Sequence, residues 1–260
     1  RDTELLHYFP TPLQKQFGEF VSRHRLAQQI VTTLLTNSLV NRMGPAFAIR
    51  AQQETGSGVD RVAQSYVIAR DIADARTLWA DIERLDTRIP TNIQYSMMYE
   101  IARKLRHSCY WILRNCNGPL DVDVMTESIS MPVQEILRDL PALMSESGAL
   151  RLEKTVRQHL RMGVPERLSR RISALGYITD ALEIVRIATD TGCNIKDMAK
   201  PYFALGEQLP FDWIRSAVDR LKVDGIWQAR ARGTLRDRAV GAQRELAGQV
   251  FGISGCGNTE

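Results

Sequence analysis

Several patterns that mark common classes of protein are missing from this sequence of 260 residues. No run approaches the roughly 18 apolar residues that a membrane-spanning helix needs, and no charged-then-apolar leader opens the chain. We therefore expect no membrane span, no secretory signal and a cytoplasmic location. The four cysteines show no CxxC spacing and the four histidines are scattered, which disfavours structural zinc. Sustained alternation of apolar and polar residues is almost absent, which disfavours β-sheet.

Catalytic signatures are equally sparse. The sequence contains no GxxxxGKS or GxxxxGKT phosphate loop, no HExxH pair and no GxSxG nucleophile turn. The segment 56–58 begins a glycine pattern of the dinucleotide-binding type, but Arg61 stands where the third glycine belongs. Asp71 and Asp74 lie one helical turn apart between arginines, so ion pairs are favoured over acid–base catalysis. We therefore predict no catalytic, cofactor-binding or metal-ligating residue in this chain.

The charge balance is mildly basic, with a formal net charge of +4 and a pI near 9.0. Basic residues concentrate in two runs, 151–171 and 230–244. Such runs either track phosphates or, more commonly, form solvated helix faces and docking surfaces. The segment 52–63 superficially resembles a helix-turn-helix, but the charges of the helix that would read DNA nearly cancel. Nucleic-acid binding is therefore the weaker alternative.

Helical periodicity is what the sequence does contain. From 23 to 43, apolar residues recur at three- and four-residue steps until Gly44-Pro45, which ends the helix because proline cannot continue the hydrogen-bond ladder. A second long helix spans about 90–116 before an Asn-Gly-Pro stop at 117–119. We predict an all-α fold, an irregular multi-helix bundle in which these two long helices belong to the core.

The stop at 117–119 is also the best candidate for a boundary. We predict an N-terminal helical part over 1–116, a C-terminal helical part packed on it over 119–250, and a flexible glycine-rich tail over 251–260. The chain opens with Arg1 rather than methionine, which suggests a segment of a longer protein.

The stretch HRLAQQIVTTLLTNSLVNRMGPAFAIRAQQETG, residues 24–56, strongly resembles the helical C-terminal region of the very large bacterial NAD-dependent glutamate dehydrogenases. The matching residues are His24-Arg25-Leu26, Asn37, Val40-Asn41-Arg42, Gly44-Pro45, Phe47 and Glu54-Thr55-Gly56. Further matches follow in the same order over roughly residues 5 to 245, among them Leu78-Trp79, Trp111-Ile112-Leu113-Arg114-Asn115, Tyr202-Phe203-Ala204-Leu205-Gly206 and Asp212-Trp213.

That family oxidatively deaminates L-glutamate to 2-oxoglutarate and ammonium and passes hydride to NAD. The resemblance implies that the reactive residues and the NAD-binding fold lie upstream of the matched region. This chain is then a non-catalytic C-terminal segment that serves domain packing, oligomerisation or regulation. Its expected partners are the catalytic domain of the same polypeptide and further copies of the enzyme, with no membrane. A free-standing helical scaffold or adaptor is the alternative.

The resemblance marks ten residues as structural or interface positions: His24, Arg25, Asn37, Asn41, Arg42, Gly44, Pro45, Trp79, Trp111 and Trp213. Polar residues at the end of a core helix more often tie neighbouring helices together than touch a ligand. A role for Arg42 in closing the glutamate cleft stays open. The four tryptophans, Trp227 included, are either core residues or anchors of a docking surface.

Overall fold

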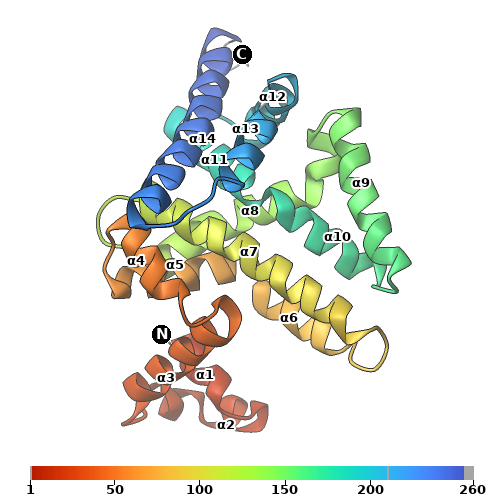
Figure 1. The fold of residues 1–260 in the computed structure, drawn as a ribbon. Helices are drawn as coiled ribbons and strands as arrows, with labels where there is room; N and C mark the ends of the chain where they lie inside the picture. Colours follow the sequence, from red (N-terminus) through yellow and green to blue (C-terminus); the bar gives the residue numbers. More distant parts are fainter. Residues whose placement is uncertain (1, 210, 255–260) are drawn as a thin grey trace, which may run out of the picture. The chain divides into compact units, whose positions relative to one another are not determined.

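The computed structural model describes residues 2–209 and 211–254. Every regular element in these ranges is a helix, and they contain no strand (Figure 1). This confirms the all-α prediction. The chain divides into two compact units, Arg1–Arg50 and Ala51–Glu260, and the division falls within α4 (Phe47–Thr55). The predicted boundary at 117–119 stays a prediction.

The first unit has a small core of its own. Its helix α1 packs on both α2 and α3, and Leu5, Val21 and Ala27 are buried together with Leu6, Phe9, Ile30 and Val31 packed against them. The helices of this unit are α1 (Asp2–Tyr8), α2 (Thr11–Ser22) and α3 (Ala27–Met43).

Helix α3 occupies most of the first predicted long helix. It ends at Gly44, whose φ of +88° lies in the left-handed region that favours glycine. Within the described residues of α3, only Ala27 and Met43 are buried. Its role as a core helix therefore stays a prediction.

The second unit is a bundle arranged around α5, α7, α8 and α11. Helix α5 packs on both α7 and α8; α11 contacts α7, α8 and α12; α10 contacts α6, α8 and α9; and α14 lies on α11, α12 and α13 (Figure 1). The bounds are α5 (Val59–Ile72), α6 (Ala75–Glu83), α7 (Thr91–Asn115), α8 (Val122–Leu143), α9 (Glu146–Arg161), α10 (Glu166–Ala174), the short 3₁₀ turn η1 (Leu175–Tyr177), α11 (Ile178–Thr191), α12 (Ile195–Gln208), α13 (Phe211–Asp219) and α14 (Ile226–Ser254).

Burial explains why α5 and α7 are central. Eight consecutive or near-consecutive positions of α5, from Val62 to Ile72, are buried, as expected for a helix covered on all sides. Helix α7 buries one stripe that contains Met97, Ile101 and Leu105 and continues to its C-terminal end. The second predicted long helix, 90–116, corresponds closely to α7.

Side-chain caps fix several helix starts. Asp121 accepts a hydrogen bond from the Val124 N–H at 3.1 Å, and Asn194 accepts one from the Lys196 N–H at 2.9 Å. Each satisfies a backbone donor that the first turn leaves without a helical partner. The glycine-rich tail was predicted from residue 251, but α14 continues to Ser254, and residues 255–260 lie outside the described residues.

Among the residues that the structure describes, no helix combines the length and the apolar character needed to cross a membrane.

Candidate functional site

The ten residues marked by the sequence are divided between the two units. Seven lie in the first unit, where Asn37 and Asn41 are exposed on α3 and Arg42 is half-buried. His24 has a local role, because its Nδ1 accepts a hydrogen bond from the Leu26 N–H at 3.1 Å just before α3 begins. Whether these positions form an interface stays a prediction.

The tryptophans divide into two pairs. Trp79 and Trp111 are buried in the second unit, whereas Trp213 is 66% exposed and Trp227 is 75% exposed. The sequence allowed each tryptophan to be a core residue or an anchor of a docking surface. Trp79 and Trp111 are core residues, whereas Trp213 and Trp227 lie at the surface of the chain. Large exposed aromatic side chains are typical of interfaces.

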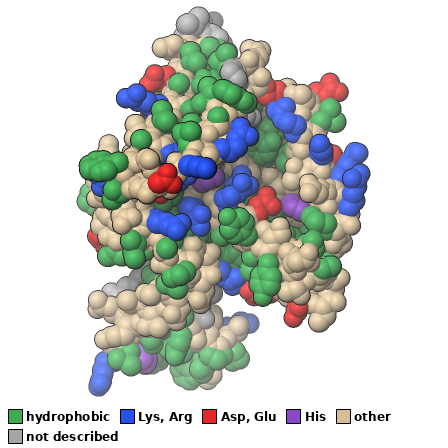
Figure 2. Space-filling model, in the orientation of Figure 1, with side chains coloured by type: hydrophobic (Ala, Val, Ile, Leu, Met, Phe, Trp, Pro, Cys, Tyr) green, Lys and Arg blue, Asp and Glu red, His purple; other side chains and the backbone are tan. Residues whose placement is uncertain are grey.

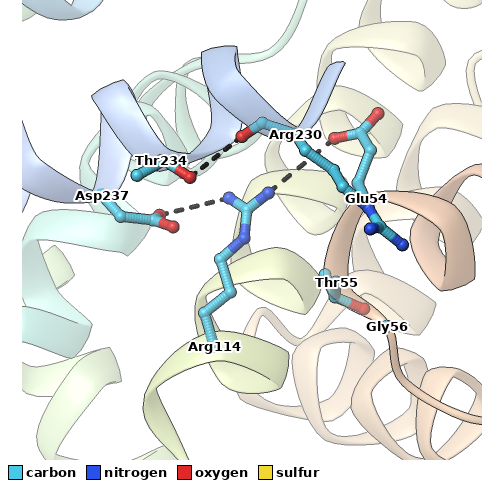
Figure 3. A pocket seen from close by; sticks show the side chains of 7 residues that line it. All are labelled: Glu54, Thr55, Gly56, Arg114, Arg230, Thr234 and Asp237. Atoms are coloured by element: carbon cyan, nitrogen blue, oxygen red, sulfur yellow. Dashed lines mark hydrogen bonds and ion pairs between the residues drawn. The ribbon is translucent and has the colours of Figure 1, made fainter. Parts of the chain in front are cut away.

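One pocket of about 330 Å³ lies in the second unit, between the end of α4, the end of α7 and the first half of α14 (Figure 3). Six of its seven lining residues have polar or charged side chains, namely Glu54, Thr55, Arg114, Arg230, Thr234 and Asp237, and the seventh is Gly56. Three of these residues, Glu54 to Gly56, are the Glu-Thr-Gly motif that the sequence analysis singled out. The pocket therefore joins a sequence motif to charged residues that are distant in the chain.

The guanidinium of Arg114 lies at the centre of this pocket, between two carboxylates (Figure 3). Arg114 Nη1 is 3.2 Å from Asp237 Oδ1, and its Nη2 is 3.9 Å from Glu54 Oε2. The same guanidinium lies over the ring of Tyr110, 5.0 Å from the ring centroid. Arg114 thus ties three separate helices together by ion pairing and cation–π contact.

Gly233 on α14 makes this arrangement possible. A Cβ atom at this position would collide with Arg114 Nη2, so the guanidinium can lie against α14 only where a side chain is missing. The residues at 230, 233, 234 and 237 share one face of α14 by their helical spacing. That face is turned toward the pocket (Figure 3).

The remaining polar groups of the pocket are held by neighbouring backbone. Arg230 Nε donates to the Gln53 carbonyl oxygen at 2.8 Å. The Thr55 hydroxyl donates to the Ala51 carbonyl oxygen at 2.7 Å, and the Thr234 hydroxyl donates to the Arg230 carbonyl oxygen at 3.0 Å. These hydroxyls are therefore bound to their own helices and are not activated by a base.

The acid–base properties of the pocket fit a structural tie better than a catalytic centre. Burial raises the pKa of Asp237, and the nearby Arg114 charge opposes this shift. Burial and then the Glu54 charge raise the pKa of Tyr110 well above its ordinary value. A phenol in this state is a poor base or nucleophile near neutral pH.

A second polar network is buried between α7, α11 and α14. The Trp111 indole Nε1–H donates to Glu183 Oε1 at 2.6 Å, and Arg244 Nη1 is 3.2 Å from Glu183 Oε2. Arg244 Nη1 also donates to Asn115 Oδ1, as does Arg186 Nη1. Glu183 is only 1% exposed, and burial raises its pKa while the Trp111 hydrogen bond and the Arg244 charge oppose that shift.

Sequence reasoning missed most of these residues. A signal for Glu183 existed, because a carboxylate inside the apolar run Ala181-Leu182-Glu183-Ile184-Val185 must find a partner if it is buried. Arg114 lies within a matched motif, but nothing in the sequence indicates its pairing with Asp237, which is 123 positions away.

Metal binding finds no support in the described part of the chain, where no group of three or more His, Cys, Asp or Glu side chains could hold an ion. The thiols of Cys109 and Cys116 are free, and burial raises the pKa of Cys109 to about 12 and that of Cys116 above its ordinary value. Neither thiol is activated as a nucleophile.

Fold and site together define an all-helical domain in which buried and partly exposed charges pair between helices. The chain belongs to the family described as "Glutamate dehydrogenase, C-terminal", whose model matches residues 2–259. This agrees with the resemblance seen in the sequence.

Proteins named "NAD-specific glutamate dehydrogenase" are similar to the chain over nearly its full length. The protein from Halomonas elongata is 34% identical over 250 residues, which cover 95% of this chain, and the one from Pseudomonas aeruginosa is 32% identical over 243 residues, which cover 94%. The protein from Mycobacterium tuberculosis is 27% identical over 251 residues, or 96% of this chain. In each case the chain spans only 15% of the length of the relative.

Proposed function

We propose that this chain is the C-terminal helical, non-catalytic part of an NAD-dependent glutamate dehydrogenase, which converts L-glutamate, NAD and water to 2-oxoglutarate, ammonium and NADH. The observation that carries the proposal is the family match over residues 2–259. The relatives named NAD-specific glutamate dehydrogenase support it, and the chain spans 15% of their length. NAD would be bound by the upstream domain. The enzyme would work in the cytoplasm.

The role of the segment is domain packing and assembly. Its charged pairs, such as Glu183 with Arg244 and Arg114 with Asp237, join helices of the domain itself. Trp213 and Trp227, by contrast, expose large apolar surfaces that a second surface could cover. The partners would be the catalytic domain of the same polypeptide and further copies of the enzyme.

A paired substitution in the parent polypeptide tests this role. We expect Trp213→Ser with Trp227→Ser to weaken subunit assembly, measured as native mass by light scattering over a dilution series. A control pair, Tyr95→Ser with Tyr99→Ser, removes aromatic side chains that are 71% and 67% exposed but carry hydroxyls that water can solvate. Equal assembly of both variants and the wild type would contradict the docking role.

A further inference from the structure

The first unit, residues 1–50, has a small hydrophobic core for its apolar content. Its long helix α3 adds little to that core, because Ala27 and Met43 are its only buried residues among those described. A unit of this size buries a small share of its surface and is only marginally stable by itself. The unit therefore keeps apolar surface that its own core does not use.

Part of this surface forms one patch on α2. Leu13, Phe17 and Phe20 recur at steps of four and three, so they lie toward one side of the helix. The backbone of α2 is kinked at Phe17, and the rings of Phe17 and Phe20 nevertheless lie edge to face with their centroids 6.5 Å apart. We call these three side chains the α2 patch.

The α2 patch is exposed to an unusual degree for its chemistry. Leu13 and Phe17 are each 41% exposed, and Phe20 is 76% exposed. None of the three side chains has a polar group that water could solvate. Figure 2 shows hydrophobic side chains over the part of the chain that Figure 1 labels α1 to α3. Single exposed apolar residues are normal, whereas adjacent ones are typical of a surface that another surface covers.

Charged residues lie beside the patch rather than within it. Lys15 and Glu19 have opposite charges, and their spacing places them on the other side of α2. Arg23 and Arg25 are exposed just after the helix ends. An apolar centre with charges at its edge is the usual anatomy of a protein–protein contact. The complementary surface is then apolar, with acidic groups where it meets the two arginines.

The preceding part of the same polypeptide is the occupant that these observations favour, and this step rests on the proposed function. The family is described as C-terminal, and the chain spans 15% of its relatives, so most of such a polypeptide precedes this segment. The match begins at residue 2, and the α2 patch lies within the next twenty residues. A tether this short gives an effective concentration of about millimolar order, which a second copy in solution does not reach.

We propose that the α2 patch packs against an apolar surface of the preceding part of the polypeptide and holds this segment to it. Phe17 and Phe20 are the expected anchors, because buried aromatic side chains dominate the energetics of such contacts. This contact is separate from the one proposed for Trp213 and Trp227, which belong to the second unit. The α2 patch forms a contact within one polypeptide.

The test measures amide hydrogen exchange of α2 peptides by mass spectrometry, in the 260-residue chain and in the parent polypeptide. Most described side chains of α2 are exposed, so its amides should exchange readily in the chain alone. In the parent we expect exchange to be at least about tenfold slower, because a covered helix must open before its amides exchange.

A paired variant shows whether the patch causes this protection. Leu13→Ser with Phe20→Ser keeps Phe17 at the kink and should restore rapid exchange of α2 in the parent. The same pair should change α2 exchange little in the 260-residue chain, which shows that the helix still forms. Val124→Ser with Met131→Ser removes side chains that are 61% and 80% exposed on α8, and should leave α2 protected in the parent.

Equal exchange of α2 in the chain and in the parent would overturn the proposal. Protection already present in the 260-residue chain would also overturn it. In that case protection that disappears on dilution assigns the patch to a second copy, and protection independent of concentration assigns it to the second unit. A parent polypeptide that does not reduce NAD with glutamate would contradict the proposed function, whereas slow exchange of α2 in that polypeptide would still support the contact.

Discussion

At the scale of single residues, buried charge is what most distinguishes this domain. Glu183 joins Trp111 of α7 to Arg244 of α14 through its two oxygens, at 2.6 Å and 3.2 Å. Such a group is costly to bury unless both oxygens are bound, and its removal leaves a cation and an indole N–H without their partner. The network is therefore expected to be sensitive to substitution.

Glu183→Ala should lower the free energy of unfolding by about 3–5 kcal/mol, because it leaves Arg244 and the Trp111 N–H inside the domain without their acceptor. Glu183→Gln keeps an acceptor for the indole and should cost less. Urea unfolding followed by tryptophan fluorescence measures both. Glu245→Ala, on the exposed side of α14, should stay within about 0.5 kcal/mol of the wild type. Equal effects at 183 and 245 would refute the network.

His107 should make the domain less stable in acid. Its pKa is lowered to about 2 in the folded chain, while the unfolded value is near 6.5. Between these values the unfolded state binds one more proton, so stability is fully present above about pH 6.5 and falls as the pH decreases, by up to about 1.4 kcal/mol per pH unit.

Urea unfolding at about pH 7 and about pH 5 measures this dependence. The wild type should lose more stability between the two conditions than His107→Gln does, because the variant has no imidazole to protonate. His24→Gln removes an exposed imidazole and serves as the control. Parallel pH dependences of the wild type and His107→Gln would contradict the account.

At the scale of elements, the approach of α14 to α7 depends on the missing side chain at Gly233. Gly233→Ala should displace the Arg114 guanidinium from Asp237, although alanine itself favours the helix by up to about 1 kcal/mol. The total stability of Gly233→Ala therefore mixes two opposing effects. The quantity to measure is the interaction free energy between the Arg114 and Asp237 side chains, from a double-mutant cycle of Arg114→Gln and Asp237→Asn.

This coupling should be about 0.5–1 kcal/mol in the otherwise native chain and close to zero once Gly233→Ala is present. Gly241→Ala, on the same helix, is the control, since its added Cβ would meet Arg244 Nη2 at an ordinary 3.6 Å. If the coupling survives Gly233→Ala unchanged, close approach at this glycine is not what positions Arg114.

The helices themselves were largely predictable from sequence, because their signals are local. The second long helix, predicted at about 90–116, is α7 (Thr91–Asn115). Asn194 has a side chain of the kind that caps helix starts, and it caps α12. These features depend on spacing and on residue type within one or two turns.

Helix α8 contains two prolines, which are ordinarily signals that a helix ends or begins. One helix nevertheless runs from Val122 to Leu143 through Pro132 and Pro141. A proline removes one backbone donor from the ladder, and a capped start and a buried face can offset that loss. Here Asp121 caps the start, and residues after Pro132, including Val133 and Leu140, are buried.

The candidate site could not be predicted for a different reason. Its central contact joins Arg114 to Asp237, 123 positions away. Helical periodicity gives the face on which a residue lies, but not the helix that packs against that face. The Glu-Thr-Gly motif marked one wall of the pocket, and the other walls follow only from the tertiary fold.

At the scale of the whole molecule, we propose that this chain is the non-catalytic C-terminal part of a much longer glutamate dehydrogenase. The family match covers residues 2–259, and the chain spans 15% of the length of its relatives. A test of this proposal must therefore measure the whole polypeptide that contains this segment.

The most direct measurement isolates that polypeptide from cells with an antibody against this chain and determines both its mass and its glutamate-dependent reduction of NAD. The account predicts a polypeptide several times heavier than 29.4 kDa that reduces NAD with glutamate, while the 260-residue chain alone is inactive. A native polypeptide near 29.4 kDa without this activity would contradict the account and favour a free-standing helical scaffold.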